Sequence, residues 1–202
     1  MSEHDTSQDE ILITRSRQGD LDAFNQLVLG YQDLVFSVIL RMVRNHATAE
    51  DITQDAFIAA YKNIGRMRGV NFRAWVLRIA RNATLDAIRR TGRRPEDSID
   101  EQIVTLGETL SSGEESPEDY AERRDLGRDI NRGLGELPPD QRMAVVMVDV
   151  EGLTYDEAAD AMEVNIGTVK SRLNRGRKRL REWIVTNVEQ LPPQFRLHDV
   201  DP

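Results

Sequence analysis

The sequence predicts an all-α protein built from two small helical domains that are joined by a flexible acidic linker. Apolar residues recur at helical spacing along most of the chain, whereas the alternating pattern of a half-buried strand is nearly absent. Hydrophobic residues make up 39% of the 202 residues but aromatic residues only 5%, so the cores should be small and aliphatic. Charge is segregated, because residues 96–122 hold ten acidic side chains and no lysine or arginine. This block predicts the position of the linker.

The first predicted domain spans residues 8–94. Apolar residues between positions 24 and 42 keep helical spacing, which predicts one long helix. We expect the next helix to begin at Thr48. Asp51, three residues after Thr48, suits an N-terminal cap at this place. That helix should run to a glycine-containing break at residues 65–69, where a turn is favoured.

A basic helix completes the first domain. It is expected to start near Asn71 and to end at Arg89-Arg90. Nine arginines and one acidic residue lie between positions 66 and 94, so this part of the chain predicts a cationic surface. Phe72 and Trp75 could serve as stacking platforms for bases, but their helical spacing makes core packing the better interpretation.

The linker covers residues 95–116 and the second domain covers residues 117–185. The linker is polar, acidic and rich in serine and glycine, which favours a flexible tether. Proline at the first helical position predicts a helix from residue 117 to about Gly135. Another helix is expected from about Asp140 to Val150. Residues 186–202 carry no clear pattern and are interpreted as a tail.

A helix-turn-helix pattern closes the second domain. Thr154 and Glu157 form a capping box for a short helix, and a turn at residues 163–165 leads into a basic helix over residues 164–182. The cations of this helix suit a phosphate backbone, so the pattern favours DNA binding over an ordinary solvated helix. The helix also carries an apolar stripe that consists of Val169, Leu173, Gly176 and Leu180. Glycine in this stripe is expected to weaken the helix by up to about 1 kcal/mol.

The composition excludes several classes of function. The chain has no cysteine and only three scattered histidines, so a disulfide framework, a thiolate zinc site and histidine-based catalysis are not expected. We expect no metal, no cofactor and no catalytic residue. No apolar run approaches the roughly 20 residues that span a bilayer, and the acidic N-terminus is unlike a signal peptide. These features predict a cytoplasmic protein without membrane insertion. The net charge of −8 does not oppose DNA binding, because the charge is unevenly spread.

Two stretches of the sequence resemble one protein family. LTYDEAADAMEVNIGTVKSRLNRGRKRLRE resembles region 4.2 of the extracytoplasmic-function sigma factors of bacterial RNA polymerase, which carry a GTVKSRL core followed by a basic stretch. AEDITQDAFIAAYKNI and FRAWVLRIARNATLDAIRR resemble region 2 of the same family. The two matches lie in the family's order and cover most of residues 10–185. Residues 8–94 are therefore interpreted as sigma region 2, and residues 117–185 as sigma region 4.

This resemblance implies an alternative sigma factor without catalytic activity of its own. Region 2 would bind the clamp helices of the polymerase β′ subunit and open the −10 element, while region 4 would read the −35 element as duplex DNA. The implied partners are the polymerase core, including its β′ clamp helices and β flap, promoter DNA, and an anti-sigma factor. Each domain alone should bind DNA weakly, and the polymerase would hold the two in register.

The resemblance also implies three sets of binding residues. The polymerase-binding set shares one helical face and consists of Asp51, Gln54, Asp55 and Ile58. Without the resemblance, the same face would be interpreted as a solvated acidic surface. The −10 DNA-binding set consists of Arg66, Arg68, Asn71, Arg78, Asn82, Arg89 and Arg90. The −35 DNA-binding set consists of Thr168, Lys170, Ser171, Arg172, Asn174, Arg175 and Lys178.

Three other functions are alternatives to this one. A dimeric helix-turn-helix repressor or activator would bind DNA without polymerase, and it leaves the acidic face unexplained. A sigma mimic that sequesters an anti-sigma factor would not need the basic recognition face. An enzyme is the weakest alternative, because the sequence shows no acid–base pair, nucleophile or metal constellation.

Overall fold

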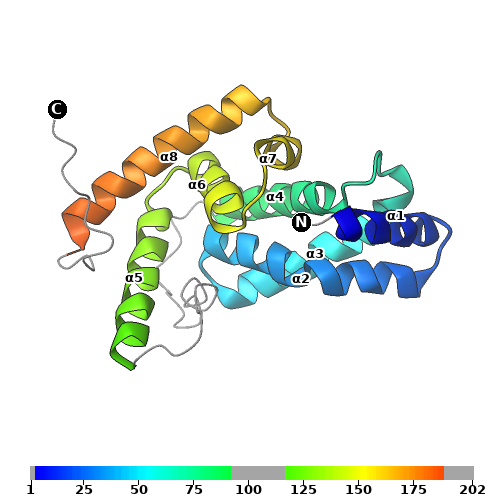
Figure 1. Ribbon diagram of the computed structural model, residues 1–202, viewed down its shortest axis with the longest axis horizontal. Coiled ribbons are helices and arrows are strands. Elements are labelled where there is room, and N and C mark those ends of the chain that lie inside the picture. The colour runs from blue at the N-terminus through cyan, green and yellow to red at the C-terminus, as the bar shows by residue number, and fades with distance from the viewer. Residues whose placement is uncertain (1–2, 92–116, 189–202) are drawn as a thin grey trace.

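The computed structural model describes residues 3–91 and 117–188, and every regular element in these two ranges is helical (Figure 1). The all-α prediction is therefore confirmed for the described residues. The predicted linker at residues 95–116 lies outside them, and so do residues 189–202 of the predicted tail.

The N-terminal unit, residues 3–91, is built around its second helix. In chain order it contains α1 (Glu3–Arg17), α2 (Leu21–Val43), α3 (His46–Asn63), the short 3₁₀ turn η1 (Ile64–Arg66) and α4 (Phe72–Thr91). Helix α2 packs against α1, α3 and α4. The sequence did not predict α1, because this helix lacks a long apolar stripe; Leu12 and Ile13 nevertheless lie buried in the core.

The start of α3 differs from the prediction. The cap is Asn45 rather than Thr48, and the Asn45 side chain accepts a hydrogen bond from the Thr48 backbone N–H at 2.8 Å. Arg44 ends α2 in the left-handed conformation at φ 59°, so two residues suffice to reverse the chain. Thr48 therefore lies inside the first turn of α3. Its backbone N–H is capped by Asn45, and its own side chain is not the cap.

Aromatic rings cluster where α4 begins, and their contacts decide whether Phe72 packs in the core or is available to stack on bases. Its ring is fully buried and lies 6.4 Å from Phe24, 5.3 Å from Tyr31 and 5.7 Å from Trp75, measured between ring centroids. The interpretation of Phe72 and Trp75 as core residues is confirmed. The preceding Asn71 caps α4, since its Oδ1 accepts a hydrogen bond from the Ala74 N–H at 3.0 Å.

The C-terminal unit, residues 117–188, ends in the helix-turn-helix. It contains α5 (Pro117–Gly135), α6 (Pro139–Val145), the π-helical segment η4 (Val146–Val150), α7 (Tyr155–Met162) and α8 (Ile166–Asn187). The capping box of Thr154 and Glu157 is present, as predicted. Asn165 caps α8 after Glu163, which adopts the left-handed conformation that closes the turn.

Two boundaries in the C-terminal unit depart from expectation. The helix predicted to end at Val150 changes to π-helical geometry from Val146 onward, and Gly152 at φ 65° then reverses the chain. At the other end, α8 continues to Asn187, so the first two residues of the predicted tail, 186 and 187, are helical. Leu180 and Trp183 explain this extension, because both side chains pack against Gly133 of α5.

Gly176 lies where α8 crosses α6. A Cβ atom at this position would sit 2.7 Å from Val145 Cγ2 and 3.1 Å from the Gln141 carbonyl oxygen. The glycine therefore permits a close approach of the two helices, which outweighs its low helix propensity. The sequence predicted a locally weaker helix here; the structure adds a packing reason for the glycine.

Helix α2 corrects the expectation that no segment is apolar enough to span a bilayer. By length and composition, Leu21–Val43 reaches that threshold. In the structure, this helix supplies the centre of the N-terminal core, with Phe24, Leu27, Val35 and Ile39 buried against its neighbours.

The two units touch along a seam formed by α2 and α4 on one side and by α5, α6, η4 and α7 on the other (Figure 1). Arg142 of α6 is 4% exposed and crosses this seam. Its guanidinium donates to the Met42 carbonyl of α2 at 2.8 Å, to the Leu137 carbonyl at 3.2 Å, and to the Gly135 carbonyl. Burial lowers the pKa of Arg142 to about 10, so the group stays charged at neutral pH.

A substitution at Gly176, where α8 crosses α6, tests whether side-chain packing or helix propensity decides the stability at this position. We expect Gly176→Ala to lower the free energy of unfolding by about 1–3 kcal/mol, because overpacking at Val145 and the Gln141 carbonyl outweighs the propensity gain. Urea denaturation of the full chain, followed by circular dichroism, measures this change.

Gly30→Ala is the matched control. A Cβ at Gly30 of α2 has no atom within 4 Å, so this substitution should stabilise the chain by about 0.5–1 kcal/mol. Stabilisation of both variants would show that the α6–α8 crossing relaxes freely and that our account of Gly176 is wrong.

Candidate nucleic-acid and polymerase interfaces

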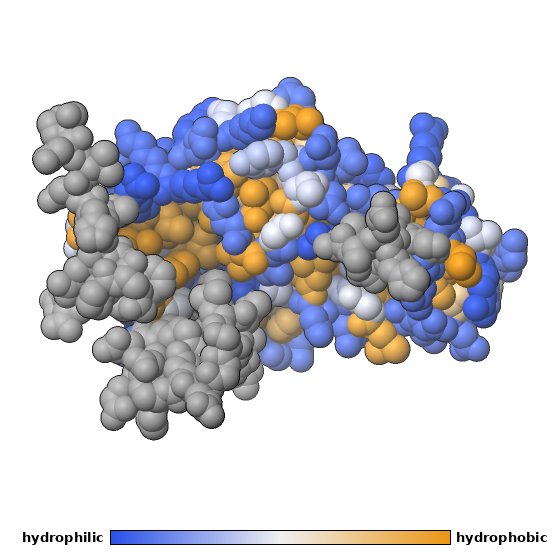
Figure 2. Space-filling view, in the orientation of Figure 1, coloured by the Kyte–Doolittle hydropathy of each residue, from blue (hydrophilic) through white to orange (hydrophobic). Residues whose placement is uncertain are grey.

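The second helix of the helix-turn-helix presents a cationic outer face. Val169, Leu173 and Gly176 are buried against the rest of the unit, as the apolar stripe predicts. Lys170, Asn174, Arg175 and Lys178 of the predicted −35 set are exposed. Figure 2 shows the outer edge along α8 as largely hydrophilic, with apolar residues gathering between α8 and the helices below it. A backbone phosphate can therefore approach this face without displacing a core side chain.

Most side chains of the predicted −35 set make contacts within the C-terminal unit. Thr168 hydrogen-bonds the cap residue through its hydroxyl at 3.0 Å, and Ser171 accepts from Arg175 one turn later. Lys170 lies over the Tyr155 ring at 5.5 Å. Arg172 is the most engaged of these residues, because its guanidinium donates to Asp140 of α6 at 3.0 Å. The structure thus gives Arg172 a structural contact inside the unit.

Arg177 forms a contact that the sequence did not reveal. Its guanidinium binds both carboxylate oxygens of Asp149 in the π-helical segment, at 2.9 and 2.5 Å. The hydrogen bonds to Asp149 raise the pKa of Arg177 above its ordinary value. The pair ties the middle of α8 to η4. The partners are 28 positions apart in the sequence, and the residues between them carry no pattern that predicts the contact.

Residues of the predicted −10 set lie on η1, on the loop after it, and along α4. Arg66 and Arg68 are exposed, and Arg17 of α1 fixes the loop by donating to the Met67 and Gly69 carbonyls at 2.7 and 3.1 Å. The side chain of Asn71 is used in capping α4. The loop therefore has a defined shape with two cations on its outer side.

Three of the four remaining members of the predicted −10 set face carboxylates. Arg78 lies 4.0 Å from Glu163 of the helix-turn-helix, and Asn82 donates to the same carboxylate at 3.4 Å. Nearer the end of α4, Arg89 pairs with Asp86 at 2.8 Å, and Arg90 donates to the Asp86 carbonyl at 3.3 Å. The middle of α4 thus faces the C-terminal unit, whereas its last turn is exposed.

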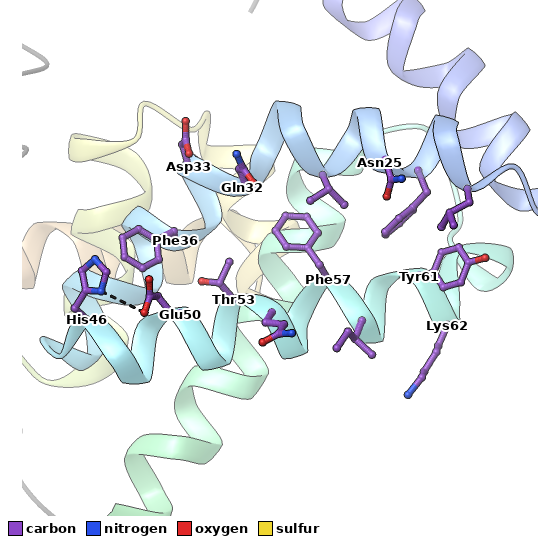
Figure 3. A pocket seen from close by; sticks show the side chains of 15 residues that line it. Asn25, Gln32, Asp33, Phe36, His46, Glu50, Thr53, Phe57, Tyr61 and Lys62 are labelled. Carbon is purple, nitrogen blue, oxygen red and sulfur yellow. Dashed lines mark ion pairs between the residues drawn. The ribbon is translucent and has the colours of Figure 1, made fainter.

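An apolar groove of about 640 Å³ runs between α2 and α3 (Figure 3). Its floor includes Phe24 and Phe57, and Figure 3 places Phe57 between the two helices with Tyr61 near one end. Gln54 and Ile58 of the predicted polymerase-binding set line this groove. The other members of that set, Asp51 and Asp55, are exposed on α3 but do not line it.

Helix α2 supplies half of the groove, which sequence reasoning missed. Its lining residues are Leu21, Phe24, Asn25, Val28, Gln32, Asp33 and Phe36. Only Phe24 and Val28 among them belong to the apolar pattern from which the sequence predicted this helix, and that pattern indicates a helix without indicating a groove. Leu21 is apolar but 53% exposed, and only the structure reveals this exposure, so the sequence held no signal for the groove.

Family models match both units of the chain. The Sigma-70 region 2 model matches residues 27–94, and the Sigma-70, region 4 model matches residues 128–180.

Curated relatives match the chain over most of its length. The chain is 34% identical over 167 residues to the ECF RNA polymerase sigma factor SigE of Mycolicibacterium smegmatis, covering 83% of this chain and 63% of that protein. It is 36% identical over 175 residues to the RNA polymerase sigma-H factor of Pseudomonas aeruginosa, covering 85% of this chain and 91% of that protein. The ECF RNA polymerase sigma-E factor of Escherichia coli is also 36% identical over 175 residues, with 84% and 91% covered.

Two solved structures share the fold. CnrH in complex with the cytosolic domain of CnrY matches with a TM-score of 0.66 and 23% identity, over 89% of this chain and 99% of that chain. RpoE in complex with the anti-sigma factor NepR from Bartonella quintana matches with a TM-score of 0.59 and 25% identity, over 81% and 98%.

Two helical units of this kind, in this order and with these matches, define a promoter-recognition subunit of bacterial transcription. The chain belongs to the sigma-70 family of RNA polymerase sigma factors, in its extracytoplasmic-function group. Sigma factors of this family bind the polymerase core and promoter DNA, and they direct the enzyme to its promoters.

The different environments of Arg172 and Asn174 predict different effects on stability. Arg172→Ala should lower the free energy of unfolding by about 1 kcal/mol, because it removes the closer of the two guanidiniums beside Asp140 and leaves only Arg81, at 3.9 Å. Asn174→Ala should stay within about 0.5 kcal/mol of the unmodified chain, since Asn174 is exposed. Urea denaturation distinguishes them, and equal stabilities would contradict a structural role for Arg172.

Proposed function

We propose that the two units divide promoter recognition between them, with residues 8–94 acting as region 2 and residues 117–185 as region 4. Region 2 binds the polymerase and the −10 element, and region 4 reads the −35 element as duplex DNA. The observation that carries this assignment is the cationic outer face of α8, placed on a helix-turn-helix whose apolar stripe is buried. That arrangement is the docking geometry of a major-groove reader.

Within region 4, the residues nearest the start of α8 are proposed to meet bases. Lys170, Ser171, Asn174 and Arg175 lie in the half of α8 that normally faces base edges, and Lys178 continues toward the phosphates. Arg172 contributes by holding α8 on α6 through Asp140. Thr168 acts at the helix start, where its backbone N–H is capped by Asn165.

Within region 2, the exposed loop cations Arg66 and Arg68 are proposed to receive the unstacked −10 strand. Cationic tracks of this kind bind single-stranded backbones without needing a fixed sequence. On α4, Arg78, Asn82, Arg89 and Arg90 extend the track, and Asn71 supports it by capping the helix.

The groove between α2 and α3 is proposed as the docking site for the β′ clamp helices of the polymerase. An apolar groove with a polar rim suits an amphipathic helix. Gln54 and Ile58 lie inside it, while Asp51 and Asp55 flank it on the exposed face of α3. Region 4 is proposed to bind the β flap, which would set its distance from region 2.

An anti-sigma factor is proposed as a further partner. The structure of RpoE from Bartonella quintana, a protein that is 25% identical to this chain, was solved in complex with the anti-sigma factor NepR. We also propose that the chain has no catalytic activity of its own, works in the cytoplasm and needs no cofactor or metal.

Run-off transcription with sigma-free core polymerase tests the proposed function. The purified chain should support promoter-specific transcripts from templates obtained by an unbiased genomic pull-down. Binding to the same DNA without polymerase, combined with no transcript, would favour the dimeric repressor or activator instead.

Variants in the groove test the polymerase-binding assignment. Gln54→Ala with Ile58→Ala should weaken core binding at least about tenfold, because both side chains line the groove and such anchors carry most interface energy. Binding of −35 duplex DNA should be unchanged, since α8 belongs to the other unit.

Leu29→Ala provides the control for this experiment. Leu29 is an apolar residue on α2 that is 68% exposed and does not line the groove. Fluorescence anisotropy with labelled chain measures both affinities. An equal loss of core and DNA binding in the groove variant would mean that Gln54 and Ile58 serve folding.

A further inference from the structure

The end of α1 is joined to the loop that leads from η1 into α4, and α1 lies beside η1 (Figure 1). Arg17 is the last residue of α1, and its guanidinium donates to the Met67 carbonyl at 2.7 Å and to the Gly69 carbonyl at 3.1 Å. The same nitrogen, Nη2, makes both hydrogen bonds, across 50 and 52 positions of sequence. Because the donor is charged, each bond is stronger than one between neutral groups.

Helix α1 is a fixed support for this contact. Leu12 and Ile13 are buried in the core of the N-terminal unit. In the last turn of the helix, Arg15 donates to Asp20 at 2.9 Å, and Asp20 is the residue that caps α2. The helix is therefore held both by its apolar side chains and by its junction with α2, so Arg17 has a defined place relative to the core.

The loop turns backbone carbonyls toward α1 and exposes the side chains between them. The Met67 side chain is buried, which fixes the start of the loop, whereas Arg68 and Val70 are exposed. Between these two residues, Gly69 adopts φ 77°. Glycine reaches this conformation without strain, but many other conformations are equally open to it. The hydrogen bonds from Arg17 on either side of position 68 select one of them.

Binding of an unstacked base depends on loop shape more than binding of a phosphate does. A base is recognised by stacking and by hydrogen bonds of fixed geometry, whereas attraction between cations and phosphates tolerates movement. Only the fraction of loop conformations that fits the base binds it, so the apparent affinity falls with that fraction. A residue that holds the loop therefore strengthens base capture without touching the base.

We propose that Arg17 is a positioning residue for base capture, and that it acts through its two hydrogen bonds to the backbone of the loop at residues 67–71. Arg17 shapes the loop, while the exposed cations Arg66 and Arg68 hold the strand. The inference rests on the proposed function for the identity of the strand that the loop receives. It gives the N-terminal helix, which the sequence did not predict, a part in promoter recognition.

A spin label in the loop measures whether Arg17 holds it. The chain has no native cysteine, so Val70→Cys provides a single labelling site at a side chain that is 38% exposed. Arg17→Lys keeps the positive charge but replaces the planar guanidinium with a shorter, flexible side chain that ends in a point charge. Electron paramagnetic resonance of the labelled full chain should therefore show faster motion of the label in Arg17→Lys than in the chain with Arg17.

Arg15→Lys is the matched control. It makes the same chemical change in the same turn of α1, but the Arg15 guanidinium binds Asp20. Motion of the label should therefore be the same with and without this substitution. Circular dichroism of each variant checks that its helices are retained.

Holoenzyme assembled from the full chain and core polymerase tests base capture. The probes are the non-template single strand of the −10 segment from a promoter mapped by run-off transcription, and the same strand with an abasic site at each position in turn. With Arg17 present, the position where the abasic site raises Kd most identifies the captured base. The ratio of abasic to intact Kd at that position should fall at least about threefold in Arg17→Lys, because fewer loop conformations fit the base. The Kd of the abasic strand itself should stay within about twofold, since the charge is retained.

Three results would overturn the proposal. Unchanged label motion in Arg17→Lys would mean that the two hydrogen bonds do not hold the loop. An unchanged ratio of abasic to intact Kd would mean that base capture does not depend on Arg17. An equal loss of affinity for intact and abasic strands would mean that Arg17 binds the DNA backbone itself.

Failure of the proposed function gives a different pattern. In that case no abasic site would weaken binding by the holoenzyme that contains Arg17, while the label would still move faster in Arg17→Lys. The spin-label experiment therefore reports on the hold of Arg17 on the loop, whatever strand the loop binds.

Discussion

Three backbone carbonyls converge on the guanidinium of Arg142, and the contact between the two units depends on this arrangement. Met42 belongs to the last turn of α2, and Gly135 ends α5, so both carbonyls lack a helical partner. A buried arginine satisfies them and brings positive charge to the negative ends of two helices. Arg44, beside Gly135, adds a second guanidinium at the same junction. Helix ends from both units are thereby fixed at one point.

This junction sets where the remaining seam residues lie. With α6 held against the end of α2, the π-helical segment carries Glu151 to Arg41, and α7 comes to rest along α4. The acidic residues of the helix-turn-helix then face the arginines of the proposed −10 helix. The groove between α2 and α3, which we propose as the polymerase-docking site, is formed within the N-terminal unit alone. The proposed docking site and the seam are therefore built from different faces of the same unit.

The sequence predicted best those features that are local. The capping box at Thr154 and the apolar stripe of α8 each involve residues within a few turns of one helix, so pattern alone identifies them. The start of α3 was predicted three residues too late, since Asn45 and Thr48 are both good caps and the left-handed Arg44 decides between them. Helix α1 was missed because its burial depends on where α2 lies.

The candidate sites show the same division. Sequence determined the chemistry of this protein: a cationic helix after a tight turn, an exposed polar face on α3, and a family order that identifies a sigma factor. Only the tertiary structure decided which of those side chains are available. Arg172 is held by Asp140, Arg78 faces Glu163, and the groove takes half of its lining from α2. The physical reason is that helical periodicity reports which face of a helix is buried, whereas the partner across that face is set by packing between segments far apart in sequence.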